Sequence, residues 1–263
     1  MKRQVWLILN SIFVLAFLLG IWQAAVLVLK VPSYMLPGPQ LVGAAVINRF
    51  STLVHSFLVT AETAVLGLFA SVLSGVAISL VFARWRWFRR LLFPYTILLQ
   101  TVPIVAIAPL IVMWTGNGIF SVALVAFIIC LAPIIVNTTQ GLISVDENLI
   151  HLFLMHNATP AQILFKLRLP HSLPNLFVGI RISAGISIVG AITGELFAGS
   201  SRVGEGGLGY SILYASSQLE TDYLFALVVA ATVLGFAFFF IGMFLEWYFL
   251  HNWHESSRPD VPD

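Results

Sequence analysis

The sequence predicts an all-α protein that crosses a membrane about six times, and three observations predict this class. Of its 263 residues, 59% are hydrophobic and only 9% are charged, whereas soluble domains carry about 25% charged residues. The mean hydropathy is +0.98. The apolar residues gather in runs near the roughly 20 residues that a helix needs to cross a bilayer. One polar stretch, residues 146–170, separates these runs in the middle of the chain.

Six apolar runs are long enough to be spans. The first, residues 5–29, follows Lys2 and Arg3 and exceeds the apolar part of a signal peptide, so we expect an uncleaved N-terminal span. The other five cover residues 57–82, 92–114, 119–136, 177–198 and 223–249. We expect a single transmembrane domain over residues 1–263, with its core at about residues 56–250 and a surface helix near residues 40–50.

The lysines and arginines of the loops predict the orientation, because cytoplasmic loops are enriched in them. Three of them fall on one side: Lys30, Arg49 and Arg202. Nine fall on the other side: Lys2, Arg3, Arg84, Arg86, Arg89, Arg90, Lys166, Arg168 and Arg258. We therefore expect a multi-pass membrane protein, in contact with lipid, with both termini and residues 146–170 in the cytoplasm.

Residues 146–170, called the central loop below, are too polar for hydrocarbon but carry apolar residues at helical spacing. The pattern predicts two short helices joined by a turn. Asn157 falls where the first helix would end, and Asn tolerates the left-handed backbone conformation. Thr159 is expected to cap the second helix, and Pro160 suits its first turn. Pro170 is expected to end it.

The central loop has three interpretations from the residues alone. It is a solvated loop that merely folds, an amphipathic element lying on lipid, or a docking element for a soluble partner. Its apolar face is neither long nor strongly basic, which keeps the docking hypothesis open.

Glycines and prolines occur within several of the predicted spans. Gly67, Gly75 and the glycines of residues 177–198 favour close helix packing. Pro103 and Pro109, together with Pro94 and Pro133, are expected to interrupt the third and fourth spans. Interrupted helices are tolerated where they face protein or a cavity, so Pro103 and Pro109 are candidates for a translocation path.

Four ionisable residues fall in or near spans, where charge is costly. Arg181 and Glu246 are expected to form an ion pair. Glu62 and Glu195 are predicted near the outer ends of their spans. They either line an outer vestibule or hydrogen-bond within the bundle.

The sequence gives no support for nucleotide binding, catalysis, metal binding or nucleic-acid binding. Gly204, Gly206 and Gly209 spell G-x-G-x-x-G, but no βαβ unit surrounds them, as a dinucleotide site requires. No nucleophile motif, basic patch or Cys/His cluster appears, and Cys130 is the only cysteine. We expect no catalytic residue, metal, cofactor or nucleic acid, and we interpret Cys130 as a packed core thiol.

The central loop resembles the EAA loop of binding-protein-dependent ABC transporter permeases. Nine residues separate Asn157 from Leu167, Leu169-Pro170 closes the motif, and Ala158-Thr159 match the small pair after its glycine. Asn157 replaces that glycine, while His151 and Phe153 stand where Glu and Ala are usual. Five further stretches follow in family order: LPGPQLV, TVPIVAIAPLIVMWTGNG, PIIVNTTQGLISVDENL, GIRIS and GELFAGSSRVGEGGLGYSI.

The resemblance implies a type I importer permease fold in the bacterial inner membrane. It also implies that the ATPase is a separate dimeric partner that docks on His151, Phe153, Asn157, Ala158, Thr159, Leu167, Leu169 and Pro170. An extracytoplasmic solute-binding protein and a second, identical permease copy are implied as further partners. The subgroup takes nitrate, sulfonates, taurine, bicarbonate or thiamine precursors. A self-contained carrier or channel is the alternative function. A membrane enzyme is a third possibility, but the sequence shows no set of catalytic residues for it.

Charge favours some of these solutes. Glu62 and Glu195 would bring carboxylates to one outer vestibule in a homodimer, and like charge repels an anion. We therefore expect a neutral or cationic solute, such as a pyrimidine-type vitamin precursor, over nitrate or a sulfonate.

Overall fold

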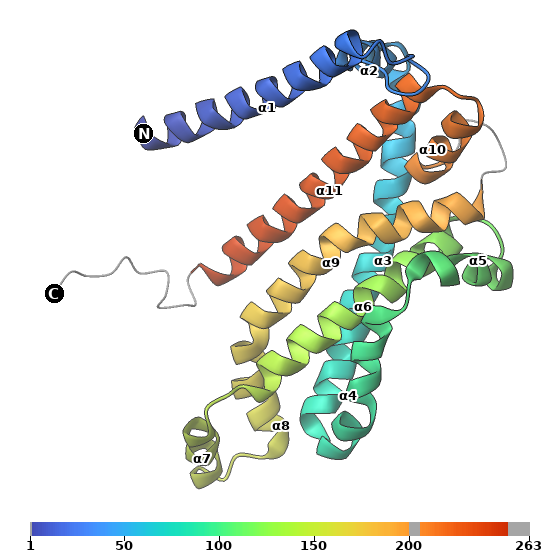
Figure 1. The fold of residues 1–263 in the computed structure, drawn as a ribbon. Helices are drawn as coiled ribbons and strands as arrows, with labels where there is room; N and C mark the ends of the chain where they lie inside the picture. The colour runs from blue at the N-terminus through green and yellow to red at the C-terminus, as the bar shows by residue number, and fades with distance from the viewer. Residues whose placement is uncertain (1, 200–205, 252–263) are drawn as a thin grey trace.

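The structure, a computed structural model, describes residues 2–199 and 206–251. These residues form helices joined by short turns, with no strand among them, which confirms the all-α prediction (Figure 1). The helices are α1 (Lys2–Val28), α2 (Pro39–Asn48), α3 (Phe50–Arg84), α4 (Arg86–Thr101), α5 (Ile104–Thr115), α6 (Ile119–Ile143), α7 (Glu147–Met155), α8 (Pro160–Ile163), the π-helical turn η1 (Leu164–Arg168), α9 (Leu169–Ala198), α10 (Leu208–Ser217) and α11 (Thr221–Leu250).

Helices α3, α6 and α9 pack against one another at the centre of the molecule (Figure 1). Small residues allow this close approach: a Cβ atom built on Gly67 of α3 would lie 2.7 Å from the Ala123 carbonyl oxygen of α6. Gly190 of α9 meets Ala126 of α6 at the same distance. Ser71 adds an interhelical bond, because its Oγ donates to the Phe127 carbonyl at 2.8 Å. Without a strong hydrophobic drive between helices in lipid, such contacts hold the bundle together.

The third predicted span, residues 92–114, is two helices rather than one. Helices α4 and α5 are bent by 101° at the break between them. Pro103 explains the break, because a proline disfavours helical backbone in the residue before it, and Val102 is extended with ψ of 121°. The prediction that Pro94, Pro109 and Pro133 also interrupt helices was wrong. Each lies inside a continuous helix, where a single lost amide bond is tolerated within packed helices.

Four helical stretches of the described residues are long and apolar enough to cross a membrane: α3, α6, the run from Pro160 to Ala198, and α11. The bent pair α4 and α5 makes a fifth if it is one span. In α1 the apolar stretch within the described side chains is Ala16–Val28. Its Trp22 ring lies 5.8 Å from that of Phe225 in α11. The count of six spans therefore stays a prediction.

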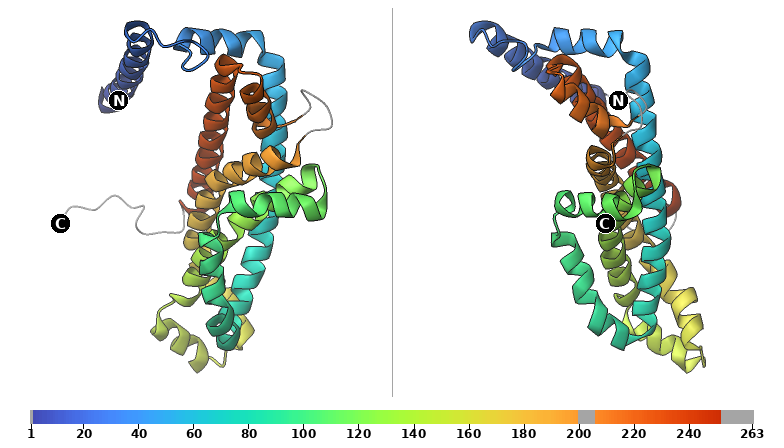
Figure 2. Two further views of the ribbon diagram at one scale, coloured as in Figure 1. Left: turned by 45° about the vertical axis from the view of Figure 1, so that its right-hand side comes forward. Right: turned by 90° about the vertical axis from the view of Figure 1, so that its right-hand side faces the viewer.

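The molecule has two unlike ends. One end carries α2, α10 and the start of α11, and the other carries α7, α8 and the start of α4 (Figures 1 and 2). The predicted surface helix at residues 40–50 is α2. These two ends hold most of the polar features described below.

Candidate functional site

The central loop folds locally as the sequence predicts. Asn157 adopts the left-handed conformation with φ of 53°, and the Ala158 amide closes the end of α7 on the Phe153 carbonyl at 3.0 Å. Thr159 caps α8 in a reciprocal capping box: its hydroxyl accepts from the Gln162 amide, and the Gln162 side chain accepts from the Thr159 amide. Pro160 occupies the first turn. Caps of this kind satisfy amides that a helix start leaves unpaired.

The prediction that Pro170 ends the second helix was wrong. Residues Pro160–Ala198 form one helical run of 39 residues. The π-helical turn explains it, because the Leu169 amide bonds the Leu164 carbonyl five residues back. This wider turn precedes Pro170, which has no amide to donate. The central loop is therefore joined to the spanning helix α9 without a break.

The central loop exposes several apolar side chains, although it is a polar segment in composition. No residue of α7 is buried in this chain, and Leu152, Leu154 and Met155 are exposed. Beside them, a shallow hollow of about 270 Å³ is lined by Phe153 and Ala158, with Leu152, His156, Gln162 and Lys166. Exposed apolar patches of this kind mark interaction surfaces.

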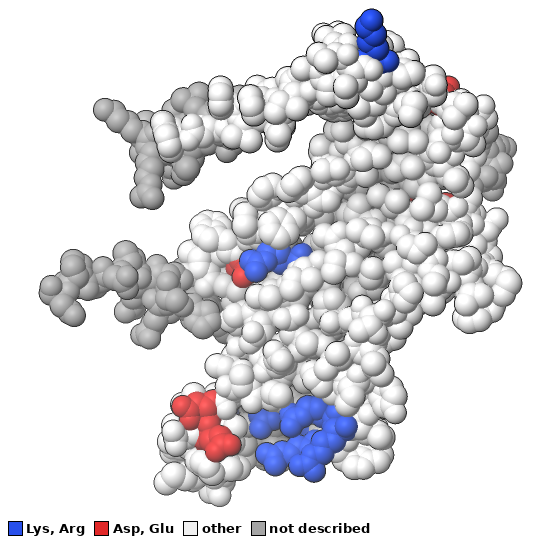
Figure 3. All heavy atoms as spheres, in the orientation of Figure 1, with Lys and Arg blue, Asp and Glu red and all other residues white. Residues whose placement is uncertain are grey.

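Basic residues border this surface. Figure 3 shows lysine and arginine side chains gathered at the end of the molecule that carries α7 and α8. A second hollow of about 260 Å³ is lined by residues of α7 and α8 together with Arg84, Arg86 and Arg168. The Arg168 Nη1 also donates to the Ala83 carbonyl at 3.1 Å, which ties the loop to the end of α3.

The other residues predicted for docking are unequally accessible. His151, Asn157 and Thr159 are exposed. Half-buried positions are Phe153, Ala158, Leu167, Leu169 and Pro170. Exposure of His151 and Asn157 beside the apolar hollow leaves them available to a partner surface.

Glu195 lies buried near the opposite end, with 4% of its surface exposed. Both carboxylate oxygens accept from the Thr60 hydroxyl of α3, at 2.8 and 2.9 Å. The Gly209 amide donates to the same carboxylate at 2.8 Å, and the Leu208 amide donates to the Thr60 oxygen at 2.8 Å. Buried charge is stable only when paired or hydrogen-bonded in this way. The group, called the Glu195 clamp below, fastens the first turn of α10 to α3 and α9.

Two glycines at the start of α10, Gly207 and Gly209, make room for the Glu195 clamp. A Cβ atom on Gly207 would lie 2.1 Å from a Glu195 carboxylate oxygen, and one on Gly209 would lie 2.4 Å from the Ile192 carbonyl. Gly209 belongs to the G-x-G-x-x-G pattern, and its missing side chain serves close packing here. Gly204 of the same pattern lies outside the described residues. Sequence reasoning missed Thr60 as a partner of Glu195. The spacing from Glu195 to Gly207-Leu208-Gly209-Tyr210 was a signal for the Gly209 bond, whereas no pattern in the sequence pointed to Thr60.

The remaining candidates for the translocation path are separated. Glu62 is exposed, whereas Thr60, two residues earlier on α3, is buried. Pro103 begins the second half of the bent pair, and Pro109 lies inside α5. Arg181 and Glu246 form the expected ion pair, with 2.7 Å between Nη1 and Oε2.

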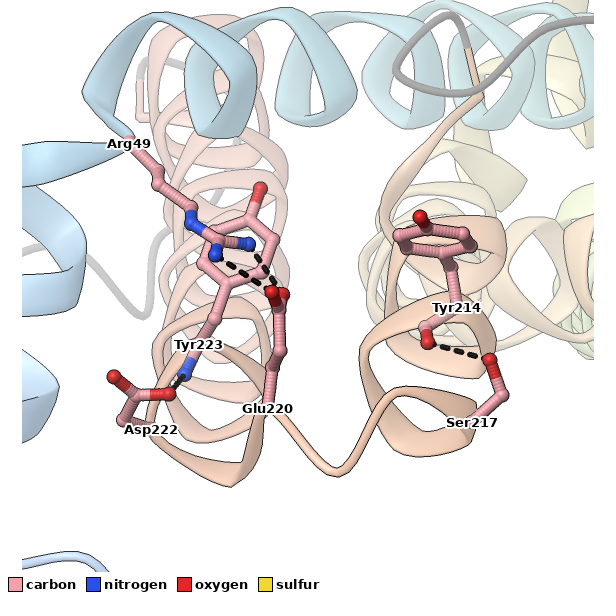
Figure 4. Close-up of polar contacts among 6 residues, drawn as sticks. All are labelled: Arg49, Tyr214, Ser217, Glu220, Asp222 and Tyr223. Carbon is pink, nitrogen blue, oxygen red and sulfur yellow. Dashed lines mark hydrogen bonds and ion pairs between the residues drawn. The ribbon is translucent and has the colours of Figure 1, made fainter.

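A second ion pair closes the corner between α2, α3 and α11 (Figure 4). The Arg49 guanidinium donates two bonds to the Glu220 carboxylate, one of them at 2.7 Å, and its carbon lies 4.7 Å from the centre of the Tyr223 ring. The hydrogen bond from Arg49 holds the pKa of Glu220 below its ordinary value. Such a two-point arrangement is among the stronger surface ion pairs.

Comparison with known proteins now gives the family. Residues 67–250 match the family model described as binding-protein-dependent transport system inner membrane component. The riboflavin transport system permease protein RibX of Chloroflexus aurantiacus is 31% identical over 94% of this chain and 91% of that protein. The taurine transport system permease protein TauC of Escherichia coli is 29% identical over 90% of this chain and 86% of that protein.

A solved structure of the MetNI methionine ABC transporter in inward-facing conformations has a TM-score of 0.54 at 18% identity. The match covers 75% of this chain and 98% of that chain, and it shows the fold alone. The apolar helices, the central loop joined to α9 and the match over residues 67–250 agree. The chain belongs to the family of binding-protein-dependent ABC transporter permeases, the inner membrane components of these importers.

Proposed function

We propose that this chain is the permease subunit of an ATP-driven importer in which two copies form the pore. Two separate ATPase subunits dock on the central loops from the cytoplasm. A solute-binding protein delivers a small solute to the opposite end, which carries α2 and α10. This chain itself catalyses no reaction.

The observation that carries the proposal is the unbroken path from the central loop into α9. Exposed apolar residues of α7 and the hollow beside Phe153 offer a partner surface. A partner that moves α8 also moves α9, because the helical run from Pro160 to Ala198 has no interruption. Helix α9 packs along α6, so movement of the docked ATPases reaches the centre of the bundle.

The self-contained carrier is the second candidate function. Such a carrier needs ionisable side chains that exchange ions near the middle of the membrane. Arg181 and Glu246 bind each other, and Glu195 is held by Thr60 and Gly209. These pairings leave Glu62 and Asp222 as the acidic side chains of the described spans that are exposed in the single chain, and Asp222 lies in the first turn of α11. The importer is therefore the better supported function.

The solute that we propose is neutral or cationic, a pyrimidine-type vitamin precursor rather than nitrate, a sulfonate or taurine. The exposed carboxylate of Glu62 supports this, because an acidic side chain near the outer end of the pore would repel anions. Relatives are named for an uncharged vitamin, riboflavin, and for taurine, a zwitterion that carries a sulfonate group. The relatives therefore favour neither class.

Co-purification tests docking. A tagged copy expressed with its ATPase should retain that ATPase, and Asn157→Gly should retain it equally, because glycine adopts positive φ readily. Asn157→Val should lose about tenfold or more of the bound ATPase, since a β-branched residue disfavours the turn.

Leu219 supplies the matched control, because it also has positive φ, 57°, at the turn before α11. Leu219→Val strains a turn at the other end and should leave ATPase association unchanged. Equal retention of ATPase by the wild type and Asn157→Val, or equal loss in both valine variants, contradicts docking through this turn.

A further inference from the structure

A hollow of about 470 Å³ lies where the bent pair α4 and α5 meets α6 and α9. Its walls are apolar apart from two side-chain amides and include Gln100, Val102, Ile104, Asn137, Ile182 and Ile186. None of its lining side chains is ionisable. The volume falls in the range of roughly 300–1,000 Å³ that small-molecule sites occupy.

The backbone at this hollow is interrupted. Helix α4 ends at Thr101 and α5 begins at Ile104, so the last carbonyls of one helix and the first amides of the other lack helical partners. The Thr101 hydroxyl bonds the Leu98 carbonyl, and the Ala106 amide bonds the Pro103 carbonyl. Irregular backbone at membrane depth occurs where it is buried in protein or lines a cavity. Val102 and Ile104, on either side of the break, line the hollow.

The two amides are suited to hydrogen-bonding an uncharged molecule. The Asn137 Nδ2 donates to the Pro133 carbonyl at 2.8 Å, which fixes the side chain. Its carbonyl oxygen and second N–H remain for other partners, because an amide offers two donors and one acceptor oxygen. Gln100 is exposed on α4 and offers the same set of groups from the opposite wall.

Two neighbouring hollows show that this polarity is not general. The hollow between α3 and α6, lined by Leu66, Gly67 and Phe120, holds no amide side chain. The hollow between α3 and α4 is lined by two residues with hydroxyl groups, Tyr95 and Thr96, and the Thr96 hydroxyl bonds the Phe93 carbonyl of its own helix. Neither hollow is lined by a side-chain amide.

We propose that the hollow at the break between α4 and α5 is a contact site for the transported solute, and that it accepts an uncharged planar ring bearing both hydrogen-bond donors and acceptors. Gln100 and Asn137 would bind the ring edge, while the isoleucines would cover its faces. An anion would lose its hydration here without meeting a positive charge, which is costly. This inference rests on the proposed importer function and narrows its solute to the neutral class.

Thiol labelling tests the site with two small reagents that differ in charge, so the solute itself is not needed. The probes are hydroxyethyl methanethiosulfonate, which is neutral, and sulfonatoethyl methanethiosulfonate, which is anionic. They are applied to Gln100→Cys in the purified permease–ATPase complex in proteoliposomes. The native Cys130 is buried, and labelling of the unsubstituted complex measures how much each reagent reacts with it. Each rate is divided by that of the same reagent with 2-mercaptoethanol, and the ratio of the two reagents removes any effect of the local thiol pKa.

We expect the neutral reagent to react at least about tenfold faster than the anionic one at Gln100→Cys, because apolar walls without cations exclude negative charge. Leu98→Cys is the matched control: it lies on the same helix but lines the neighbouring apolar hollow. It should react with neither reagent. Equal corrected rates at Gln100→Cys, or no reaction there with either reagent, overturn the inference.

Uptake adds a second readout. Gln100→Leu should lower uptake of an uncharged ring solute, with riboflavin as the probe, relative to Gln140→Leu, which alters an exposed amide outside the hollow. Equal riboflavin uptake by Gln100→Leu and Gln140→Leu would also overturn the inference. The importer function fails separately, when no ATPase co-purifies with the unsubstituted permease, whatever the labelling rates are.

Discussion

The two ends of this molecule are built on opposite principles. At one end, α7 buries none of its residues in this chain, and the central loop relies on local caps and turns. At the other end, Leu208, Gly209, Ser211 and Ala215 of α10 are buried, and hydrogen bonds run from α10 to α3 and α9. The difference teaches that α10 is completed by its own chain, whereas α7 presents an incomplete surface that a partner can cover.

The largest expected effect concerns which end faces the cytoplasm. Cysteines at Ser144 and Arg86, both exposed, should be labelled by an impermeant maleimide only in inverted vesicles. A cysteine at the exposed Gln218, at the opposite end, should be labelled only in intact cells. The expected contrast is all or none. Labelling of Ser144→Cys or Arg86→Cys from outside would reverse the roles of the two ends.

The next effect concerns stability at the Glu195 clamp. Glu195→Ala leaves the Thr60 hydroxyl and the Gly209 amide without their acceptor, at a cost of about 1–3 kcal/mol for each stranded group. Thr60→Val should also lower the melting temperature in detergent, and Thr60→Ser should restore it.

Thr63→Val is the control for this prediction. The Thr63 hydroxyl is also buried, but it bonds carbonyls of its own helix. Thr63→Val should therefore lower the melting temperature less than Thr60→Val does. Equal melting temperatures for Thr60→Val and the wild type would show that the Glu195 clamp does not hold α10.

The smallest effect concerns the Arg49–Glu220 pair. Its side chains are 44% and 32% exposed, and solvent screening limits such a pair to about 0–1 kcal/mol. Because Arg49 lowers the pKa of Glu220, this stabilisation is present above the unfolded value of about 4.3 and is lost as pH falls through the folded value. Glu220→Gln should lower the melting temperature slightly at pH 7, and the difference should vanish in acid. A larger gap in acid than at pH 7 would contradict the assignment.

The features that were predictable from the sequence are those encoded in neighbouring residues or forced by the membrane. Asn157 and Thr159 act on residues within four positions, so their turn and cap follow from residue type. Arg181 and Glu246 were predictable as a pair because charges in apolar spans need partners. The continuation of the helix through Pro170 was not predictable, since proline normally ends helices and the π-helical turn leaves no simple pattern.

The partner of Glu195 was hidden for a different reason. Thr60 lies 135 residues away in the sequence, and a threonine in an apolar helix gives no sign of what its hydroxyl bonds. Only the packing of α3 against α9 brings the two together. The hollow beside Gln100 is equally invisible in sequence, because it forms only where α4 and α5, bent by 101°, pack against α6, which carries Asn137.

The Glu195 clamp also bears on how the protein is made. Synthesis proceeds from the N-terminus, so Thr60 enters the bilayer before Glu195 leaves the ribosome. A lone acidic residue entering hydrocarbon costs about 2.5–3.5 kcal/mol on insertion scales. The hydroxyl already present on α3 offers the arriving carboxylate its first partner, and the Gly209 amide of the following segment completes the set. Because α3 precedes α9 in the chain, the Thr60 hydroxyl is in the membrane before the Glu195 carboxylate. The carboxylate gains its last hydrogen bond only when α10 has been synthesised.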